Sequence, residues 1–129
     1  MRNFVQITPQ LLVPSLEQAL GLFRDVLGFV VPFSTIDYAY VEREGVAFRL
    51  LELPGVTATP PEQALRSSYI DVRDVDGLYA ELTPKLSTLL PEDVEAPRDQ
   101  HWGQREFAVR GPDGHFIVFG QAIATVETD

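Results

Sequence analysis

The hydrophobic positions in the first half of the chain predict one amphipathic helix followed by strands. From Ser15 to Leu27 the sequence reads SLEQALGLFRDVL, and its apolar residues recur at helical spacing on one face (Leu16, Ala19, Leu20, Phe23 and Leu27). Ser15 is a suitable N-cap, and Gln18 completes a capping box. Gly28 stands where helices commonly end in a left-handed residue. After this helix DYAYVER alternates between two faces, and Glu44-Gly45 predicts a turn into the strand VAFRLLEL.

The second half of the chain begins after a Pro-rich stretch, LPGVTATPP, and contains the same kinds of element. YIDV predicts a strand, and Asp74 is placed to cap the predicted helix VDGLYAEL. One face of that helix is apolar (Val75, Leu78, Tyr79 and Leu82). We expect Pro84 to end or kink it. Residues 85–98 show little periodicity, whereas REFAVR, a GPDG turn and HFIVFGQ predict a closing hairpin.

The two halves align with each other. LVPSLEQAL (12–20) lies over DVRDVDGLY (71–79), which matches the cap Ser15 with the cap Asp74, 59 positions later. Each half runs strand, helix and then about three strands. A repeated unit that cannot bury its own apolar face should be paired with its copy. The sequence therefore predicts an α+β fold with two βαβββ modules forming a curved mixed sheet around a cleft.

The length of 129 residues is typical of a single domain. We expect one domain over residues 1–129, with module one at about 1–53, a linker at about 54–66 and module two at about 67–125.

Composition and charge restrict the class of partner. The chain has no Cys, which excludes disulfides, thiolate metal sites and Cys nucleophiles. The net charge of −9 disfavours nucleic acid and anionic lipid and would concentrate cationic small molecules, although acidity alone also serves solubility. No apolar run approaches the roughly 20 residues of a membrane span, and the N-terminus lacks a signal-peptide pattern. We expect a cytoplasmic protein that binds neither membrane nor nucleic acid.

Residues with catalytic or metal-binding chemistry are few. The sequence has no Gly-rich phosphate loop and no nucleophile elbow. Asp74 and Asp76 suit a helix cap and first turn, where carboxylates favour the helix dipole. His101 and His115 lie 14 positions apart without a third ligand in pattern, so a metal site on them is weakly supported. We expect His115 to be a surface strand residue, and His101 is a candidate for the edge of the cleft.

Three segments together resemble a known superfamily: LLVPSLEQALGLFRDVLGF, VRDVDGLYAEL and WGQREFAVRGPDGHFIVFG. They are similar to the glyoxalase, bleomycin-resistance and extradiol-dioxygenase proteins, also called the vicinal oxygen chelate superfamily. The run WG-x-REF followed by PDG resembles the bleomycin-binding resistance proteins in particular. The resemblance covers nearly the whole chain, except for the linker and residues 85–98.

The enzymes of that superfamily hold a divalent metal with four side chains, two from each module. The resemblance places the corresponding positions here at Thr8, Ser67, Arg49 and Val118. None of these supplies a carboxylate or imidazole, and Glu52 nearby is a single carboxylate. We therefore expect no metal, no cofactor and no catalytic residue.

Aromatic residues are the main candidates for ligand binding. Trp102 lies in a polar flank, so its ring is available to stack on a planar or cationic ligand, although Trp also anchors loops and dimer interfaces. The resemblance implies that Phe33 and Tyr38 line the ligand cleft. The remaining candidates are Phe48, Tyr40, His101 and Arg105. The alternatives are that strand aromatics belong to the core and that Arg105 forms a structural ion pair.

Pro9 interrupts an apolar run, which suits a hinge or an edge strand. The resemblance implies that the first strand, near Pro9, is exchanged between the protomers of a homodimer. Our leading hypothesis is a metal-free protein that sequesters a cationic, planar antibiotic of the bleomycin type. The alternatives are a metal-dependent lyase or dioxygenase of the same fold and a binding protein for another small molecule.

Overall fold

The computed structural model of the protein describes residues 1–55, 66–111 and 113–123. These residues form two compact units. Module one contains residues 1–55 together with 113–114, and module two contains residues 66–111 together with 115–123. Residues 56–65 of the predicted linker lie outside the described residues.

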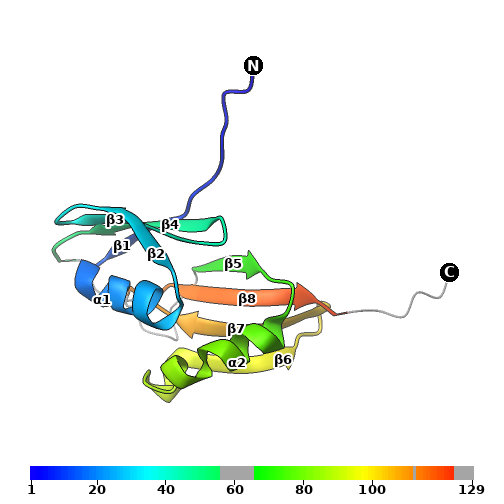
Figure 1. Ribbon diagram of the computed structural model, residues 1–129. Helices are drawn as coiled ribbons and strands as arrows, with labels where there is room; N and C mark the ends of the chain where they lie inside the picture. The colour runs from blue at the N-terminus through cyan, green and yellow to red at the C-terminus, as the bar shows by residue number, and fades with distance from the viewer. Residues whose placement is uncertain (56–65, 112, 124–129) are drawn as a thin grey trace. The chain divides into compact units, whose positions relative to one another are not determined.

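Module one is a four-stranded mixed sheet with one helical segment (Figure 1). Its elements are β1 (Gln10–Val13), α1 (Leu16–Leu20), η1 (Gly21–Val26), β2 (Val30–Ser34), β3 (Tyr38–Arg43) and β4 (Val46–Glu52). The strand order is β1-β4-β3-β2, in which β1 runs parallel to β4 and the other pairs are antiparallel. The turn between β3 and β4 has positive φ at Glu44 and Gly45, as a tight hairpin requires.

The helical segment of module one differs from the predicted single α-helix. Ser15 caps it as expected, because its Oγ accepts from the Gln18 N–H at 3.2 Å. After Leu20 the segment continues as a π-helical turn, in which the Leu27 N–H donates to the Leu22 carbonyl at 2.9 Å. Because of this wider turn the Leu22 side chain lies in the core. Leu20, which we expected on the buried face of the helix, is only half-buried.

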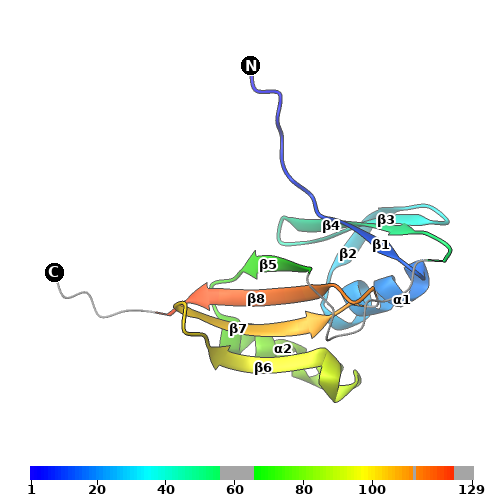
Figure 2. The same cartoon turned by 180° about the vertical axis from the view of Figure 1, so that it is seen from behind.

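Module two repeats this architecture. Its elements are β5 (Ser67–Asp71), α2 (Val75–Leu86), η3 (Pro91–Asp93), β6 (Val94–Asp99), β7 (Gln104–Arg110) and β8 (Phe116–Ala122). The sheet order is β5-β8-β7-β6, with β5 parallel to β8. Both views show α2 running along the sheet, against which it packs through β6, β7 and β8 (Figures 1 and 2). The Tyr79 ring meets the Phe107 ring edge-on, with centroids 5.2 Å apart.

Of the two predicted effects of Pro84, an end of the helix is wrong, because α2 runs through Pro84 to Leu86. Pro84 lies in the last turn, so few helical hydrogen bonds depend on it. The buried Leu86 side chain anchors that turn. The rest of the weakly periodic region 85–98 forms η3 and most of β6.

The internal repeat extends to side-chain contacts. In module one the Glu52 Oε1 accepts from the Leu16 N–H at 2.7 Å, so that β4 satisfies the first turn of α1. In module two the Gln121 Oε1 accepts from the Val75 N–H at the start of α2. The α+β class and the two βαβββ modules are confirmed, and each module forms its own four-stranded mixed sheet. In the described ranges no helix has the length and apolar character to span a bilayer.

Candidate functional site

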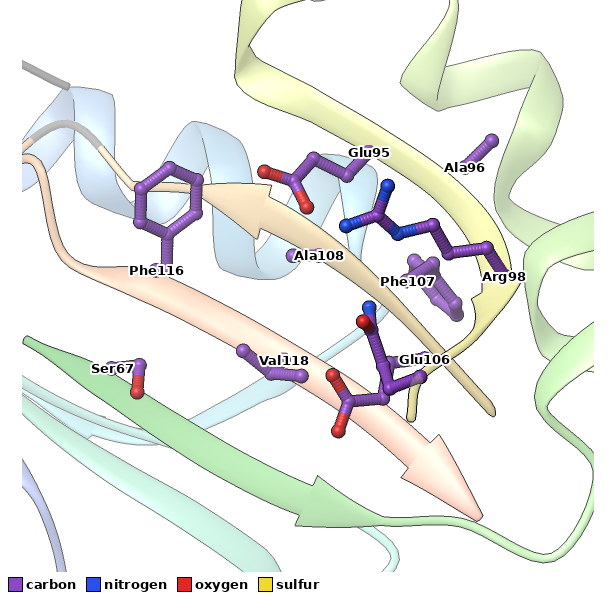
Figure 3. A pocket seen from close by; sticks show the side chains of 10 residues that line it. Ser67, Glu95, Ala96, Arg98, Glu106, Phe107, Ala108, Phe116 and Val118 are labelled. Atoms are coloured by element: carbon purple, nitrogen blue, oxygen red, sulfur yellow. The ribbon is translucent and has the colours of Figure 1, made fainter. Parts of the chain in front are cut away.

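The pocket on the sheet of module two is about 210 Å³ in volume (Figure 3). Strand alternation separates the residues of β7 into two sets, because successive side chains point to opposite faces. Phe107 and Val109 are buried, and Phe107 meets Tyr79 of α2. Glu106 and Ala108 alternate with them and line the pocket. The complete lining is Ser67, Glu95, Ala96, Arg98, Gln100, Glu106, Phe107, Ala108, Phe116 and Val118.

Trp102 lies beside this pocket and is bonded to one of its walls. The indole Nε1 donates to the Glu106 Oε2 at 3.1 Å, while 57% of the residue remains exposed. His101 meets the indole edge-on at 4.7 Å between ring centroids. Both residues lie in the turn between β6 and β7, where Gly103 adopts a φ of 90° and the Gln100 N–H donates to the Gln104 carbonyl at 2.7 Å. The turn therefore presents a planar surface next to a carboxylate.

Tyr69 of β5 completes the surroundings of Glu106. Its hydroxyl donates to the Gln104 Oε1 at 3.0 Å and lies close to Gly120 of β8. A Cβ at position 120 would be 1.9 Å from the Tyr69 hydroxyl oxygen, so a side chain there would displace the ring. Burial of the hydroxyl, followed by the hydrogen bonding and charge of Glu106, raises the pKa of Tyr69 to about 12. Tyr69 is therefore a neutral donor at physiological pH.

Arg105, a predicted ligand contact, is engaged elsewhere. Its Nε donates to both carboxylate oxygens of Asp76 at 3.1 Å, and its Nη1 donates to Asp99 at 3.1 Å. These bonds, first to Asp99 and then to Asp76, raise the pKa of the guanidinium. Asp76 belongs to the first turn of α2 and Asp99 to the end of β6. The structural ion pair considered in the sequence analysis is therefore present.

Three of the aromatic candidates for ligand binding, Phe33, Tyr38 and Tyr40, lie on one face of the module-one sheet. Phe33 of β2 and Tyr38 of β3 have ring centroids 6.0 Å apart. The Arg49 guanidinium carbon lies 5.0 Å from the centre of the Tyr40 ring, and the guanidinium donates to the Tyr38 hydroxyl. Phe33 is 56% exposed. This face therefore combines aromatic rings with one cation.

Phe48 and His115 are both buried: Phe48 in the core position that the sequence analysis kept as an alternative, and His115 against the prediction of a surface strand residue. Phe48 is 1% exposed and packs against Phe23 and Phe29, so its place is in the hydrophobic core rather than on a ligand-binding face. The alternation of β4 explains this, because Phe48 and Leu50 point to one side and Arg49 to the other. His115 is buried, not a surface residue, and its Nε2 lies 2.7 Å from the Ser68 Oγ.

The positions expected to bind metal in related enzymes do not carry a suitable set of donors. Ser67 and Val118 both line the pocket of module two, and neither side chain is a carboxylate or imidazole. In module one Arg49 occupies such a position, and the nearby Glu52 accepts from the first turn of α1. Within the described ranges, no three or more His, Cys, Asp or Glu side chains are grouped closely enough to hold a metal ion.

Sequence reasoning did not single out the pocket-lining residues Glu95 and Arg98, nor Tyr69, whose hydroxyl donates to Gln104 beside the pocket. Glu95 and Arg98 lie in the segment without periodicity, which provided no strand to place them on. The hydrogen bond between Trp102 and Glu106 could have been predicted from the sequence. The two residues are four positions apart across a Gly-containing turn, and such a turn can bring a residue beside its partner at the start of the next strand.

Fold and site together define a class of protein: a duplicated βαβββ chain with a small pocket in module two and an exposed indole beside it. The model of the Glyoxalase/Bleomycin resistance protein/Dioxygenase superfamily matches residues 4–119. The chain therefore belongs to this superfamily.

Individual proteins to which the chain is similar include bleomycin resistance proteins. A bleomycin resistance protein of Geobacillus stearothermophilus is 29% identical over 132 aligned positions, which cover 92% of this chain and 98% of the relative. The crystal structure of a bleomycin resistance determinant encoded on transposon Tn5 superposes with a TM-score of 0.73 at 21% identity, covering 92% of this chain and 98% of the other. The bleomycin-binding protein of Streptomyces verticillus, solved with copper(II)-bleomycin, has a TM-score of 0.73 at 23% identity, with coverages of 97% and 100%.

Proposed function

We propose that the protein binds a bleomycin-type glycopeptide antibiotic and confers resistance by stoichiometric capture in the cytoplasm, without a metal of its own. The observation that carries the proposal is Trp102, an exposed indole held at the edge of a pocket by its bond to Glu106. A fixed planar surface loses little conformational freedom when a planar ligand stacks on it.

Two further features support this function. Module one has an aromatic face of its own, with Phe33, Tyr38 and Tyr40, on which a planar ligand can stack. The net charge of −9 favours the approach of a cationic ligand through long-range attraction. Capture requires no reacting group, so it is compatible with the Ser67 and Val118 side chains at positions where a related enzyme would need metal ligands.

The test is a titration of the protein with metal-free bleomycin, followed by Trp102 fluorescence and by calorimetry. Trp102 is the only Trp in the chain, so its emission reports on this surface alone. We expect saturable, stoichiometric binding and recovery of chemically unchanged drug after the protein is denatured. Absence of saturation at micromolar protein would overturn the antibiotic assignment, and a modified drug would overturn capture. Stoichiometric divalent metal in protein purified without chelators would contradict the metal-free part.

The proposal includes a homodimer that exchanges the segment before Pro9. Residues 1–7 are exposed and include the apolar side chains Phe4, Val5 and Ile7, each more than 90% exposed. The first strand, β1, begins only at Gln10. Just before it, the Pro9 carbonyl accepts from the Arg49 N–H of β4 at 2.9 Å. An apolar arm of this kind is stabilised when a second copy covers it. Light scattering after gel filtration should give a dimer, and deletion of residues 1–7 should shift it towards monomer. An unchanged dimer in that deletion would exclude exchange.

A further inference from the structure

The aromatic face of module one also carries a charge. The cross-strand register of the sheet (Figure 1) aligns one residue from each of its four strands in a row: Gln10, Arg49, Tyr40 and Phe33. Residues paired directly across neighbouring strands point to the same side of a sheet. Tyr38 points to that side as well, because it lies two residues before Tyr40 on β3. The aromatic face therefore includes a guanidinium among its rings.

Arg49 is held on this face by aromatic partners. Its guanidinium carbon lies 5.0 Å from the centre of the Tyr40 ring, and the guanidinium donates to the Tyr38 hydroxyl. Within residues 1–55, 66–111 and 113–123, no ion pair involves Arg49. Other arginines do pair with carboxylates, at N···O distances from 2.9 to 3.3 Å: Arg24, Arg43, Arg105 and Arg110.

The absence of a carboxylate partner within those ranges is informative because the chain has 19 acidic and 10 basic side chains. A guanidinium has five N–H donors, and the Tyr38 hydroxyl accepts from it at one nitrogen. The remaining donors and the positive charge are exposed to solvent, since Arg49 is an exposed residue. They are therefore available to an anionic ligand.

The surroundings of Arg49 indicate the shape of that ligand. The planar fork of a guanidinium matches a carboxylate through two parallel hydrogen bonds. Phe33 is 56% exposed, and its ring centroid lies 6.0 Å from that of Tyr38, so the face offers rings for stacking. Neighbouring strands are about 4.8 Å apart, so Arg49 and Phe33, two strands apart, are separated by about 10 Å. This spacing suits a carboxylate attached to a two-ring aromatic body.

We propose that the aromatic face of module one binds a planar aromatic carboxylate, with the carboxylate on Arg49 and the rings stacked over Phe33 and Tyr38. This class of ligand differs from the cationic antibiotic of the proposed function, and the inference does not rest on that function. The net charge of −9 repels anions at long range. Affinity for such an acid must therefore arise from Arg49 and the rings beside it.

Glu42 provides an internal check on the position of the anion. It follows Tyr40 on the same side of β3 and lies opposite Ala47, which places it diagonal to Arg49. A unit charge about 7 Å away in water changes the affinity for an ion about two- to threefold. Glu42→Gln should therefore strengthen the binding of an aromatic carboxylate, whereas Arg49→Gln should weaken it. A general loss of structure would weaken binding in both variants.

The first experiment titrates the full chain with 2-naphthoate, 2-naphthamide and cyclohexanecarboxylate, at low salt and into the millimolar range, by calorimetry. The first probe has a planar body and a charge, the second only the planar body, and the third only the charge. We expect saturable binding of one 2-naphthoate per chain and at least tenfold weaker binding of the other two. Failure of 2-naphthoate to saturate, or an equal affinity for either of the other probes, would overturn the proposal.

Variants with matched controls then test the charged residues. Loss of a charge-assisted hydrogen bond corresponds to about a tenfold or larger loss of affinity, which we expect for 2-naphthoate in Arg49→Gln. Arg73→Gln changes the net charge equally at an exposed position of module two and should have little effect. Glu92→Gln is the corresponding control for Glu42→Gln. Equal affinities in the two arginine variants, or weaker binding in Glu42→Gln, would contradict the proposal. Circular dichroism checks the fold of each variant.

The stacking surface is tested by Phe33→Leu. This variant removes an exposed ring and should weaken 2-naphthoate while leaving the weaker binding of cyclohexanecarboxylate unchanged. Equal weakening of both acids would contradict stacking over Phe33.

Nuclear magnetic resonance locates the probe on the protein. The Arg49 Nε–H signal is identified by its loss in Arg49→Gln, and we expect it to shift when 2-naphthoate is added. A shift of the Trp102 indole N–H alone would place the acid on the other module and overturn the proposal. Coverage of the aromatic face by a second copy of the chain would also overturn it. In that case 2-naphthoate would not bind, and Arg49→Gln would change the mass measured by light scattering.

Discussion

Phe48 and Phe33 were both predicted ligand contacts, and the structure separates them. Phe48 is 1% exposed, with ring centroids 5.0 Å from Phe23 and 6.0 Å from Phe29, whereas Phe33 is 56% exposed. Phe48→Ala should therefore act on stability and Phe33→Ala on ligand binding. The pair tests whether strand alternation, rather than residue type, assigns each aromatic its role.

The expected size of the Phe48 effect follows from its burial. Replacing a fully buried Phe by Ala costs about 3–5 kcal/mol, through lost transfer free energy and the cavity that remains. This is a large part of the roughly 5–15 kcal/mol by which a domain is stable. At roughly 3–5 °C per kcal/mol, the melting temperature should fall by about 9–25 °C. Phe33→Ala leaves no cavity, so its cost should stay within about 0.5 kcal/mol.

The assay is urea unfolding of both variants, followed by circular dichroism, together with bleomycin titration of the folded protein. Phe48→Leu provides a milder change, expected to cost less than about 1.5 kcal/mol, in case Phe48→Ala does not fold. Our assignment predicts a large loss of stability for Phe48→Ala and near-native affinity for Phe48→Leu. Equal, small stability losses in Phe33→Ala and Phe48→Ala, with equally weakened binding, would show that Phe48 belongs to the ligand surface.

Three further predictions concern the helix starts and Tyr69. Glu52→Ala should lower the free energy of unfolding by about 1–2 kcal/mol, because the Leu16 N–H loses its acceptor. Glu52→Gln should retain most of the stability, because the amide oxygen of Gln121 accepts from the first helical N–H in the same way in module two. Equal losses in chemical unfolding of the two variants would contradict this reasoning. Gly77→Ala should fail to give the roughly 1 kcal/mol that helix propensity promises, since its Cβ would be 2.2 Å from the Oδ2 of Asp74, the residue whose Oδ1 caps α2 by accepting from the Gly77 N–H. A clear gain in melting temperature would argue against the cap. In an absorbance titration one tyrosine should ionise only near pH 12 and disappear from the curve in Tyr69→Phe. The pKa of Tyr69 is raised from 10.0 to about 12 in the folded protein, so its contribution to stability is complete below pH 10 and is lost as the pH rises to about 12. If the free energy of unfolding falls between pH 10 and 12 by the same amount in the unmodified protein and in Tyr69→Phe, the shift is contradicted.

The sequence by itself determined the local elements and their repetition. Ser15 and Asp74 cap helices as expected. In each cap a side-chain oxygen accepts from the N–H three residues later, and such a bond depends only on the local backbone conformation. The Glu44-Gly45 turn was predicted from its own residues, and the alternation of DYAYVER put Ala39 and Val41 on one face of the strand, which the structure shows to be the buried one. The repeat with a spacing of 59 predicted two equivalent modules, because copies of one pattern fold in the same way.

Only the tertiary structure decided which of these positions face the core and which form the site. The π-helical turn at Leu22, the continuation of α2 past Pro84 and the burial of His115 all depend on packing against distant strands. The pocket likewise joins β6 and β7 to β5 and β8, and the Trp102–Glu106 bond forms across the turn that connects β6 to β7. Hydrophobic periodicity records which side chains share a face of a strand. It does not show which other elements pack against that face, and the burial and hydrogen bonding of each side chain depend on those elements.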